Sequence, residues 1–326
     1  MGNREAHNIS VVIPTADRSR HLNDALESIG KQSRPIKEMI IIDSSRTKDT
    51  WTLIATKKKI FAKKGIQVNY FWEPRISISH ARNTGLRKAK SEFVMFLDDD
   101  MVLSEGYLEE LMKVFKEYPS AIGVQGKYQF WSAITNRIRL IMLIRKLFLV
   151  TYWWPDTQRI LASGDYVIAE PLTCIISAEL IWIQASVFRK KYLDGFWFDE
   201  NLKGYSYGED VDFTMRLNKR FPHSLFVTPY AKSIHDRATL ERVHTSKKIR
   251  AHELYLFRKN MVELGWNWLA FLWRNVGMIL LVLLGLRIKE NRLRLFQVFS
   301  SYVWCLGQFG NVISGGIPKS GQAERF

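Results

Sequence analysis

Short hydrophobic runs alternate with helical patterns along the first part of the chain. The runs at residues 9–13, 39–43 and 93–97 are almost unbroken, which is typical of strands buried on both faces of a parallel sheet. From Leu22 to Ile29, hydrophobic residues recur every three or four positions, which predicts an amphipathic helix. A strand, a helix and a strand in this order predict a βαβ unit and an α/β fold.

Three aspartates, Asp98, Asp99 and Asp100, directly follow the last of these runs. Parallel strands bring their carboxyl ends to one edge of a sheet, where ligands bind, so we expect these aspartates beside loops 14–18 and 43–50. Adjacent carboxylates repel one another unless a positive group lies among them, and a hard divalent cation meets that need. The alternative interpretation is a solvated acidic turn.

The remaining patterns extend the same architecture. Hydrophobic spacing predicts further helices at 51–64, 81–89, 108–115 and 209–220, strands at 68–72 and 122–130, and a strand passing into a short helix at 179–194.

Composition narrows the class of protein. With 326 residues, 47% of them hydrophobic and 25% charged, the chain is neither disordered nor of low complexity. The two cysteines cannot build a zinc cluster by themselves or a disulfide framework. The net charge of +16 predicts anionic partners, among which nucleic acid, anionic lipid and phosphorylated substrates all qualify.

A second acidic cluster, Glu209, Asp210 and Asp212, opens the helix expected at 209–220. Acidic residues are favoured at a helix start, so ordinary helix chemistry is one interpretation. The aromatic neighbours of the cluster support a second interpretation of equal weight, in which one of these acids is a partly desolvated general base.

Three further side chains are candidates for phosphate or metal contacts. Arg82 and Asn83 precede the strand at 93–97, where a nucleotide diphosphate would need donors, although a solvent-facing helix is the alternative. His235 follows a short apolar stretch and is a candidate metal or phosphate ligand, although a lone histidine is more often structural.

Together these segments resemble the family 2 glycosyltransferases, which have the A-type glycosyltransferase fold, and the resemblance covers roughly residues 8–240. The motifs in order are VVIPT (11–15), IIID (40–43), ARNTGL (81–86), FVMFLDDDM (93–101), FWFDENL (196–202) and GEDVDF (208–213). The resemblance implies a single Rossmann-like domain that binds a nucleotide sugar with Mg²⁺ or Mn²⁺ and transfers the sugar with inversion.

The resemblance also implies roles for individual residues. Asp210 would be the catalytic base, and Asp100 and His235 would contact the metal. Asp98 would face the ribose. The donor-binding set would comprise Pro14, Thr15, Asp17, Asp43, Arg82, Asn83, Asp98 and Asp99, and the acceptor-binding set Glu209, Trp182, Trp197 and Tyr207. Two departures from the family pattern are present. Asp43 is followed by Ser44 where the family often has a second aspartate, which leaves the nucleotide base of the donor open, and Asp17 stands where asparagine is usual.

The last quarter of the chain has a different pattern. Segments 275–286 and 295–318 carry no charge, and the linker between them contains four basic residues and one acidic residue. The first segment is short for a membrane span, so we expect an interfacial or re-entrant hairpin with the linker on anionic lipid. A buried helical subdomain is the alternative. The expected division is a catalytic domain at 1–245 and a membrane-associating region at 246–326.

The resemblance therefore implies an inverting, metal-dependent hexosyl- or deoxyhexosyltransferase of bacterial type that acts on a glycan or lipid-linked glycan in cell-envelope polysaccharide biosynthesis. No secretory signal is visible at the start of the sequence, so we expect the cytoplasmic face of the membrane, with a peripheral or re-entrant anchor. One alternative is a nucleotidyl or phosphoryl transferase that uses the same aspartates, although no GxxxxGK[ST] loop occurs. Another is a non-catalytic basic protein that binds membrane or nucleic acid. We expect no nucleic-acid partner.

Overall fold

A computed structural model describes residues 8–128, 136–202, 206–235, 246–265 and 267–284, together with residues 300, 304 and 307. The chain divides into two compact units. The first contains Met1–Phe130 and Leu172–Arg237, and the second contains Trp131–Pro171 and Ala238–Phe326.

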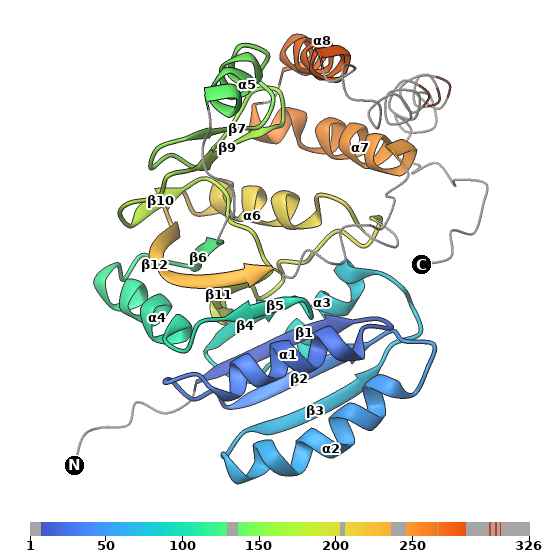
Figure 1. Cartoon of the computed structure of the whole chain (residues 1–326), viewed down its shortest axis with the longest axis vertical. Helices are drawn as coiled ribbons and strands as arrows, with labels where there is room; N and C mark the ends of the chain where they lie inside the picture. Colours follow the sequence, from blue (N-terminus) through green and yellow to red (C-terminus); the bar gives the residue numbers. More distant parts are fainter. Residues whose placement is uncertain are drawn as a thin grey trace. The chain divides into compact units, whose positions relative to one another are not determined.

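The first unit is built on a mixed sheet in the strand order β10-β12-β6-β11-β4-β1-β2-β3, with β5 paired to β12. Its parallel half contains β1 (Ile9–Thr15), β2 (Glu38–Asp43), β3 (Gln67–Trp72) and β4 (Phe93–Leu97). Every residue of β1, β2 and β4 is buried, which explains their unbroken hydrophobic runs. The predicted α/β fold with a central sheet is confirmed (Figure 1).

The other half of the sheet is mixed. The strand β11 (Ala185–Arg189) runs antiparallel between β4 and β6 (Gly123–Tyr128). Next comes β12 (Leu225–His235), which pairs with β6, β10 (Ile176–Ala178) and β5 (Met101–Leu103). The sequence had indicated only an apolar stretch at the start of β12, because Pro229 and the polar residues after it obscure the strand pattern.

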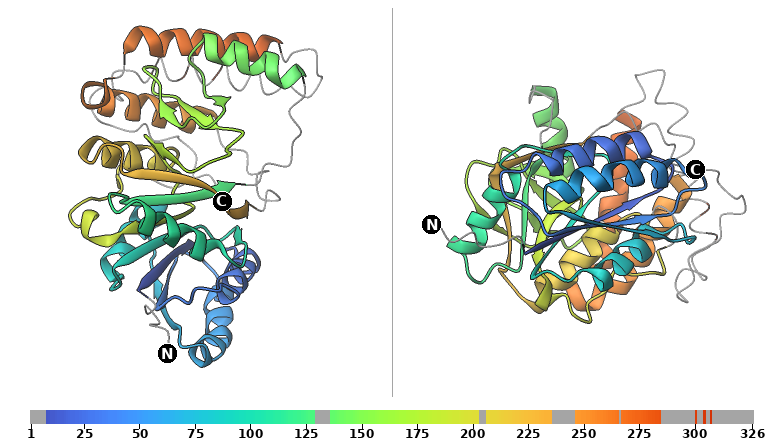
Figure 2. Two further views of the ribbon diagram at one scale, coloured as in Figure 1. Left: turned by 90° about the vertical axis from the view of Figure 1, so that its left-hand side faces the viewer. Right: turned by 90° about the horizontal axis from the view of Figure 1, so that it is seen from below.

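Helices cover both faces of this sheet (Figures 1 and 2). One face packs against α1 (Ser19–Gly30), α2 (Asp49–Lys63) and α4 (Tyr107–Glu117), whose buried residues share a single core with Val11 and Met95. The opposite face meets α3 (Ile78–Lys88), whose Gly85 approaches β1 so closely that an added Cβ would lie 2.1 Å from Val12. The glycine of the ARNTGL motif is therefore required by packing.

The same face carries α6 (Glu209–Arg220), which begins and ends at the predicted residues. An aromatic cluster joins this helix to the sheet. Phe213 stacks on Phe198 at 4.0 Å, and Phe198 contacts Phe96 of β4 edge to face at 5.3 Å. This apolar contact fixes the start of α6 relative to the end of β4. A short 3₁₀ turn, η1 (Lys190–Tyr192), follows β11 as expected.

The second unit contains α5 (Asn136–Leu147), α7 (Ser246–Leu264), α8 (Trp268–Leu284) and a small sheet in the order β7-β9-β8. Its strands are β7 (Tyr152–Trp154), β8 (Arg159–Ile160) and β9 (Tyr166–Ala169). The guanidinium of Arg274 is buried there, 2.9 Å from Asp165 and 3.2 Å from Glu253. The structure thus groups residues 131–171 with the end of the chain, whereas the sequence-based division at residue 245 places them in the catalytic domain.

Within the described part of the chain, no helix combines the length and the hydropathy that crossing a bilayer requires. Most of the uncharged segment 295–318 lies outside the described residues.

Candidate active site

The carboxyl ends of three parallel strands bring polar side chains to one edge of the sheet. Thr15 and Asp43 are register partners at the ends of β1 and β2, and Asp98 directly follows β4. Pro14 precedes Thr15 and is buried in β1. The edge predicted from the strand pattern is therefore where the structure gathers the candidate residues.

Asp99 joins the end of β1 to the end of β4. Its carboxylate accepts hydrogen bonds from Thr15 Oγ1 at 2.7 Å and from Arg18 Nη1 at 2.8 Å. Burial raises the pKa of Asp99 to about 7, although the charge of Arg18 opposes this shift. Asp99 thus holds the β1 loop in place, and its direct contact with a donor stays a prediction.

Asp100 and His235 are brought together from the ends of β4 and β12. The Nε2 atom of His235 lies 3.2 Å from Asp100 Oδ1, and Arg18 Nη1 lies 3.0 Å from Asp100 Oδ2. Burial alone would raise the pKa of Asp100, but the hydrogen bond and the charge of His235 hold that pKa below its ordinary value. The hydrogen bond to Asp100 in turn raises the pKa of His235.

This pair fits a divalent cation. In an octahedral site with ligands at about 2.1 Å, neighbouring ligand atoms are roughly 3 Å apart, which is close to the 3.2 Å between Asp100 and His235. Among the described residues, no group of three or more histidines, cysteines and acids is arranged to hold a metal ion. Asp100 and His235 are therefore candidates for part of a coordination shell that a bound diphosphate could complete, and their role as metal ligands stays a prediction.

Arg82 links the two acidic motifs of the site. Its side chain is fully buried, and it donates from Nη2 to Asp98 at 2.7 Å and from Nη1 to Glu209 at 2.5 Å. Asp98 and Glu209 come from the ends of different elements, β4 and α6. The guanidinium geometry suits such a bridge, because its nitrogens donate in fixed directions.

Asp210 lies beside this bridge at the start of α6. Gly208 precedes the helix with a φ of 83°, a conformation that glycine adopts without steric cost, so the chain turns sharply into Glu209 and Asp210. Asp210 accepts hydrogen bonds from Val211 N at 2.8 Å and from Gln184 Nε2 at 3.2 Å. Gln184 is a site residue that the sequence motifs did not indicate.

Glu209 and Asp210, the two acids at the start of α6, both have raised pKa values but differ in the causes. Burial raises the pKa of Asp210, while Arg82 opposes the shift. Burial and the neighbouring charge of Asp210 together raise the pKa of Glu209 to about 8. A carboxylate with a raised pKa is suited to accept a proton near neutral pH.

Asp43 is the last residue of β2, and Asp17 lies in the loop that follows β1. The Asp43 carboxylate accepts from Tyr70 Oη at 2.7 Å and from Ser45 N at 2.9 Å. Asp17 pairs with Arg46 at 2.8 Å and has a φ of 54°, a left-handed conformation that both asparagine and aspartate adopt readily. This shared tolerance explains why aspartate can stand where asparagine is usual.

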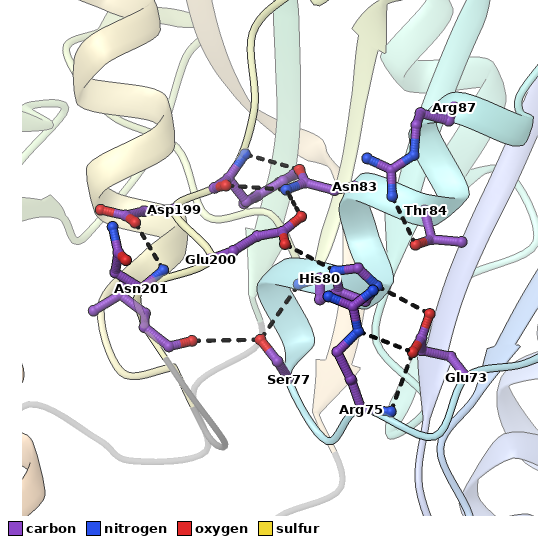
Figure 3. A network of polar contacts seen from close by, with 12 residues as sticks. Glu73, Arg75, Ser77, His80, Asn83, Thr84, Arg87, Asp199, Glu200 and Asn201 are labelled. Carbon is purple, nitrogen blue, oxygen red and sulfur yellow. Dashed lines mark hydrogen bonds and ion pairs between the residues drawn. The ribbon is translucent and has the colours of Figure 1, made fainter. Parts of the chain in front are cut away.

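Asn83 makes contacts within the protein with both ends of its amide. Its Nδ2 donates to Phe198 O at 3.0 Å and to Glu200 at 2.9 Å, and its Oδ1 accepts from Phe198 N at 2.9 Å. Next to it, His80 bridges Glu200 and Glu73, each at 2.9 Å (Figure 3). This network ties α3 to the segment before α6, whereas a contact of Asn83 with the nucleotide stays a prediction.

The three aromatic residues expected to contact an acceptor are all at least partly accessible. Trp197 and Tyr207 are 39% and 36% exposed, and Trp182 is partly buried, edge to face with Tyr128 at 5.9 Å. Trp197 lies under the guanidinium of Arg87, 5.5 Å from its ring centre. Their acceptor roles stay predictions.

Known proteins resemble this chain most clearly in its N-terminal half. The family model described as Glycosyl transferase family 2 matches residues 10–168. The poly(ribitol-phosphate) beta-N-acetylglucosaminyltransferase TarP of Staphylococcus aureus is 33% identical over 126 residues, which cover 36% of this chain and 38% of that protein. A Campylobacter jejuni enzyme, GalNAc(5)-diNAcBac-PP-undecaprenol beta-1,3-glucosyltransferase, is 34% identical over 111 residues, 33% of this chain and 35% of that protein. The matched stretch thus spans well under half the length of these relatives.

A solved structure supports the same fold. The mannosyltransferase PcManGT from Pyrobaculum calidifontis, in complex with GDP-Man and Mn²⁺, superposes with a TM-score of 0.53 at 15% identity, covering 94% of this chain and 77% of that chain. Residues 10–168 therefore match glycosyl transferase family 2, and this chain has the A-type glycosyltransferase fold.

Proposed function

We propose that this chain transfers a sugar, with inversion, from a nucleotide-diphosphate sugar to a hydroxyl group of a glycan or lipid-linked glycan. The observation that carries the proposal is the bridge of Arg82 between Asp98 and Glu209, which holds the candidate base Asp210 next to the acidic edge of the sheet. The two curated relatives are named as β-transferring enzymes of a polyol phosphate polymer and of an undecaprenol-linked glycan. Their names support an acceptor from cell-envelope polysaccharide synthesis.

In this mechanism Asp210 accepts the proton of the acceptor hydroxyl as its oxygen attacks the anomeric carbon. Inversion follows because the oxygen enters opposite the departing diphosphate. Gln184 and the amide of Val211 orient the Asp210 carboxylate, and Arg82 keeps Glu209 and Asp98 in place. Asp100 and His235 would hold Mg²⁺ or Mn²⁺, which neutralises charge on a leaving diphosphate when bound.

The proposed location is the cytoplasmic face of a membrane, where a lipid-linked acceptor would lie. The net charge of +16 supports it, because the cytoplasmic leaflet is anionic. The sequence places the membrane-associating region in the last quarter of the chain, where α8 is strongly hydrophobic. We propose a peripheral or re-entrant attachment through this hydrophobic helical region.

The test is a binding and turnover assay of the purified chain with Mn²⁺ and a panel of UDP-, dTDP- and GDP-sugars. We expect one donor to bind in a metal-dependent way and to release its nucleoside diphosphate slowly. In Asp210→Asn, transfer should fall by about 10²–10⁴-fold, the usual contribution of a general base, while donor affinity is retained. Near-normal turnover of this variant would overturn the assignment of the base.

The chemical identity of the product separates the enzyme classes. Release of a nucleoside diphosphate together with a glycosylated acceptor supports sugar transfer. Release of a nucleoside monophosphate or of inorganic phosphate would instead support a nucleotidyl or phosphoryl transferase.

A further inference from the structure

The second unit exposes a hydrophobic face made by two adjacent helices. Trp273 of α8 donates from Nε1 to Leu147 O at 2.9 Å and stacks on Phe148, with ring centres 4.7 Å apart. Gly277 of α8 lies so close to Phe148 that an added Cβ would be 2.2 Å from it. The helices α5 and α8 therefore pack side by side (Figure 2).

The exposed side of α8 is apolar along its whole length. Among the side chains of α8 that the structure describes, six large hydrophobic ones are exposed, namely Leu269, Leu272, Trp273, Val276, Ile279 and Leu283. Their spacings of one, three or four residues place them on one face of the helix. The charged residue of α8, Arg274, instead points inward and is held by Asp165 and Glu253. This helix is thus apolar outside and charged inside, the reverse of an ordinary surface helix.

The neighbouring helix extends the same face and adds positive charge. Leu140, Leu143 and Leu147 of α5 are 60%, 59% and 65% exposed and recur at helical spacing. Exposed Arg139 and Lys146 lie one position from Leu140 and Leu147, and neither α5 nor α8 contains an acidic residue. Lys146 also lies 3.6 Å from the ring centre of Trp154, which is 44% exposed.

We infer that this α5–α8 face, defined by the nine exposed hydrophobic residues of the two helices, is the surface through which the protein binds an anionic lipid bilayer. An apolar face bordered by cations and an interfacial tryptophan matches a bilayer surface, where acyl chains lie below anionic headgroups. The basic residues at the border favour a bilayer over a second copy of this chain as the partner of this face. The α5–α8 face of a second copy carries the same positive charge, so the two faces would repel each other.

This inference deepens the proposed membrane location and does not depend on sugar transfer. It assigns the contact to α5 as well as to the C-terminal region, although α5 lies more than a hundred residues earlier in the sequence than α8. The helices would lie in the plane of the headgroups, because 17 residues of α8 span only about 25 Å.

The test measures binding of the full chain to phosphatidylcholine vesicles with and without phosphatidylglycerol, in the absence of donor and metal. The double variant Leu143→Glu with Val276→Glu should weaken binding at least about tenfold, because each apolar side chain loses its burial in lipid. A matched control, Ile60→Glu with Tyr230→Glu, adds the same charge at exposed hydrophobic positions of α2 and β12 and should bind like the wild type. The variant Arg139→Gln with Lys146→Gln should weaken binding to anionic vesicles by about fivefold per charge.

Circular dichroism and donor binding establish that each variant is folded. Vesicle binding of Leu143→Glu with Val276→Glu at the wild-type level would overturn the inference. A second outcome would also overturn it: the wild type sediments as a dimer, this variant sediments as a monomer, and vesicle binding stays unchanged. Since the binding assay contains no donor, loss of sugar transfer with intact vesicle binding would contradict only the proposed function.

Discussion

Arg82 Nη1 lies 2.5 Å from Glu209 Oε1, although the two residues are 127 positions apart in the sequence. The contact joins α3, which packs against the sheet, to the first turn of α6, which carries Asp210. A single buried cation thus fixes the distance between the acidic end of β4 and the start of α6. Both ends of the bridge are carboxylates whose pairing depends on this one guanidinium.

Removal of this cation should destabilise the protein and inactivate it. Arg82→Met leaves buried Glu209 without its partner, which costs about 3–5 kcal/mol in comparable buried pairs. Thermal unfolding should show a clear loss of stability, and sugar transfer should fall with it. Adding Glu209→Leu should restore part of the stability, because it removes the buried carboxyl group that has lost its partner, while transfer stays low. Equal activity of the double variant and the wild type would contradict the positioning role of Arg82.

The pH dependence of transfer should report on the base. Asp210 must be deprotonated to accept a proton, and burial raises its pKa above the ordinary value. The hydrogen bond from Gln184 lowers that pKa, so Gln184→Leu should raise it. The acidic limb of the kcat/KM profile should therefore move to higher pH in this variant.

Tyr128 provides a control for this shift. Its hydroxyl donates to the amide oxygen of Gln184 at 3.0 Å, whereas the amide nitrogen of Gln184 donates to Asp210. Loss of the Tyr128 hydroxyl therefore leaves the donor to Asp210 in place. In Tyr128→Phe the acidic limb should stay close to its wild-type position. A limb that stays in place or moves to lower pH in Gln184→Leu would show that another group controls the rate.

The strand runs and the helix at 209–220 were predictable because local hydrophobic patterns determine them. Asp98, Asp210 and Arg82 were identified as candidates from motif order, but their contacts depend on tertiary packing. The spacing of Arg82 and Glu209 in the sequence does not indicate a salt bridge, because the fold must first bring α3 and α6 together. The network of His80, with its two glutamates, was invisible for the same reason.

The amide of Asn83 should matter for stability more than its exposed neighbours do. Asn83→Ala leaves the backbone N–H and C=O of Phe198 without their partner, at a cost of about 1–3 kcal/mol for each unsatisfied group. Because Phe198 stacks on Phe213 of α6, kcat should fall more than donor affinity. Thr84→Ala, on the same helix, removes only a surface hydrogen bond to Arg87 and should change stability by no more than about 0.5 kcal/mol. Similar unfolding temperatures for the two variants would contradict this account.

Metal-dependent donor binding should require the pair at the ends of β4 and β12. Asp100→Asn and His235→Gln each remove one ligand of the proposed site, so titration of the donor with Mn²⁺ present should show weaker binding in both variants. Chelation of Mn²⁺ should weaken wild-type binding and leave the variants nearly unaffected, because they have already lost most of the metal's contribution. Asp24→Asn, on the exposed side of α1, serves as the control for loss of one negative charge and should respond to chelation like the wild type. The contrary outcome is that the chelator weakens donor binding equally in all four proteins. The cation would then be held by other groups, and Asp100 and His235 would be a structural ion pair that joins β4 to β12.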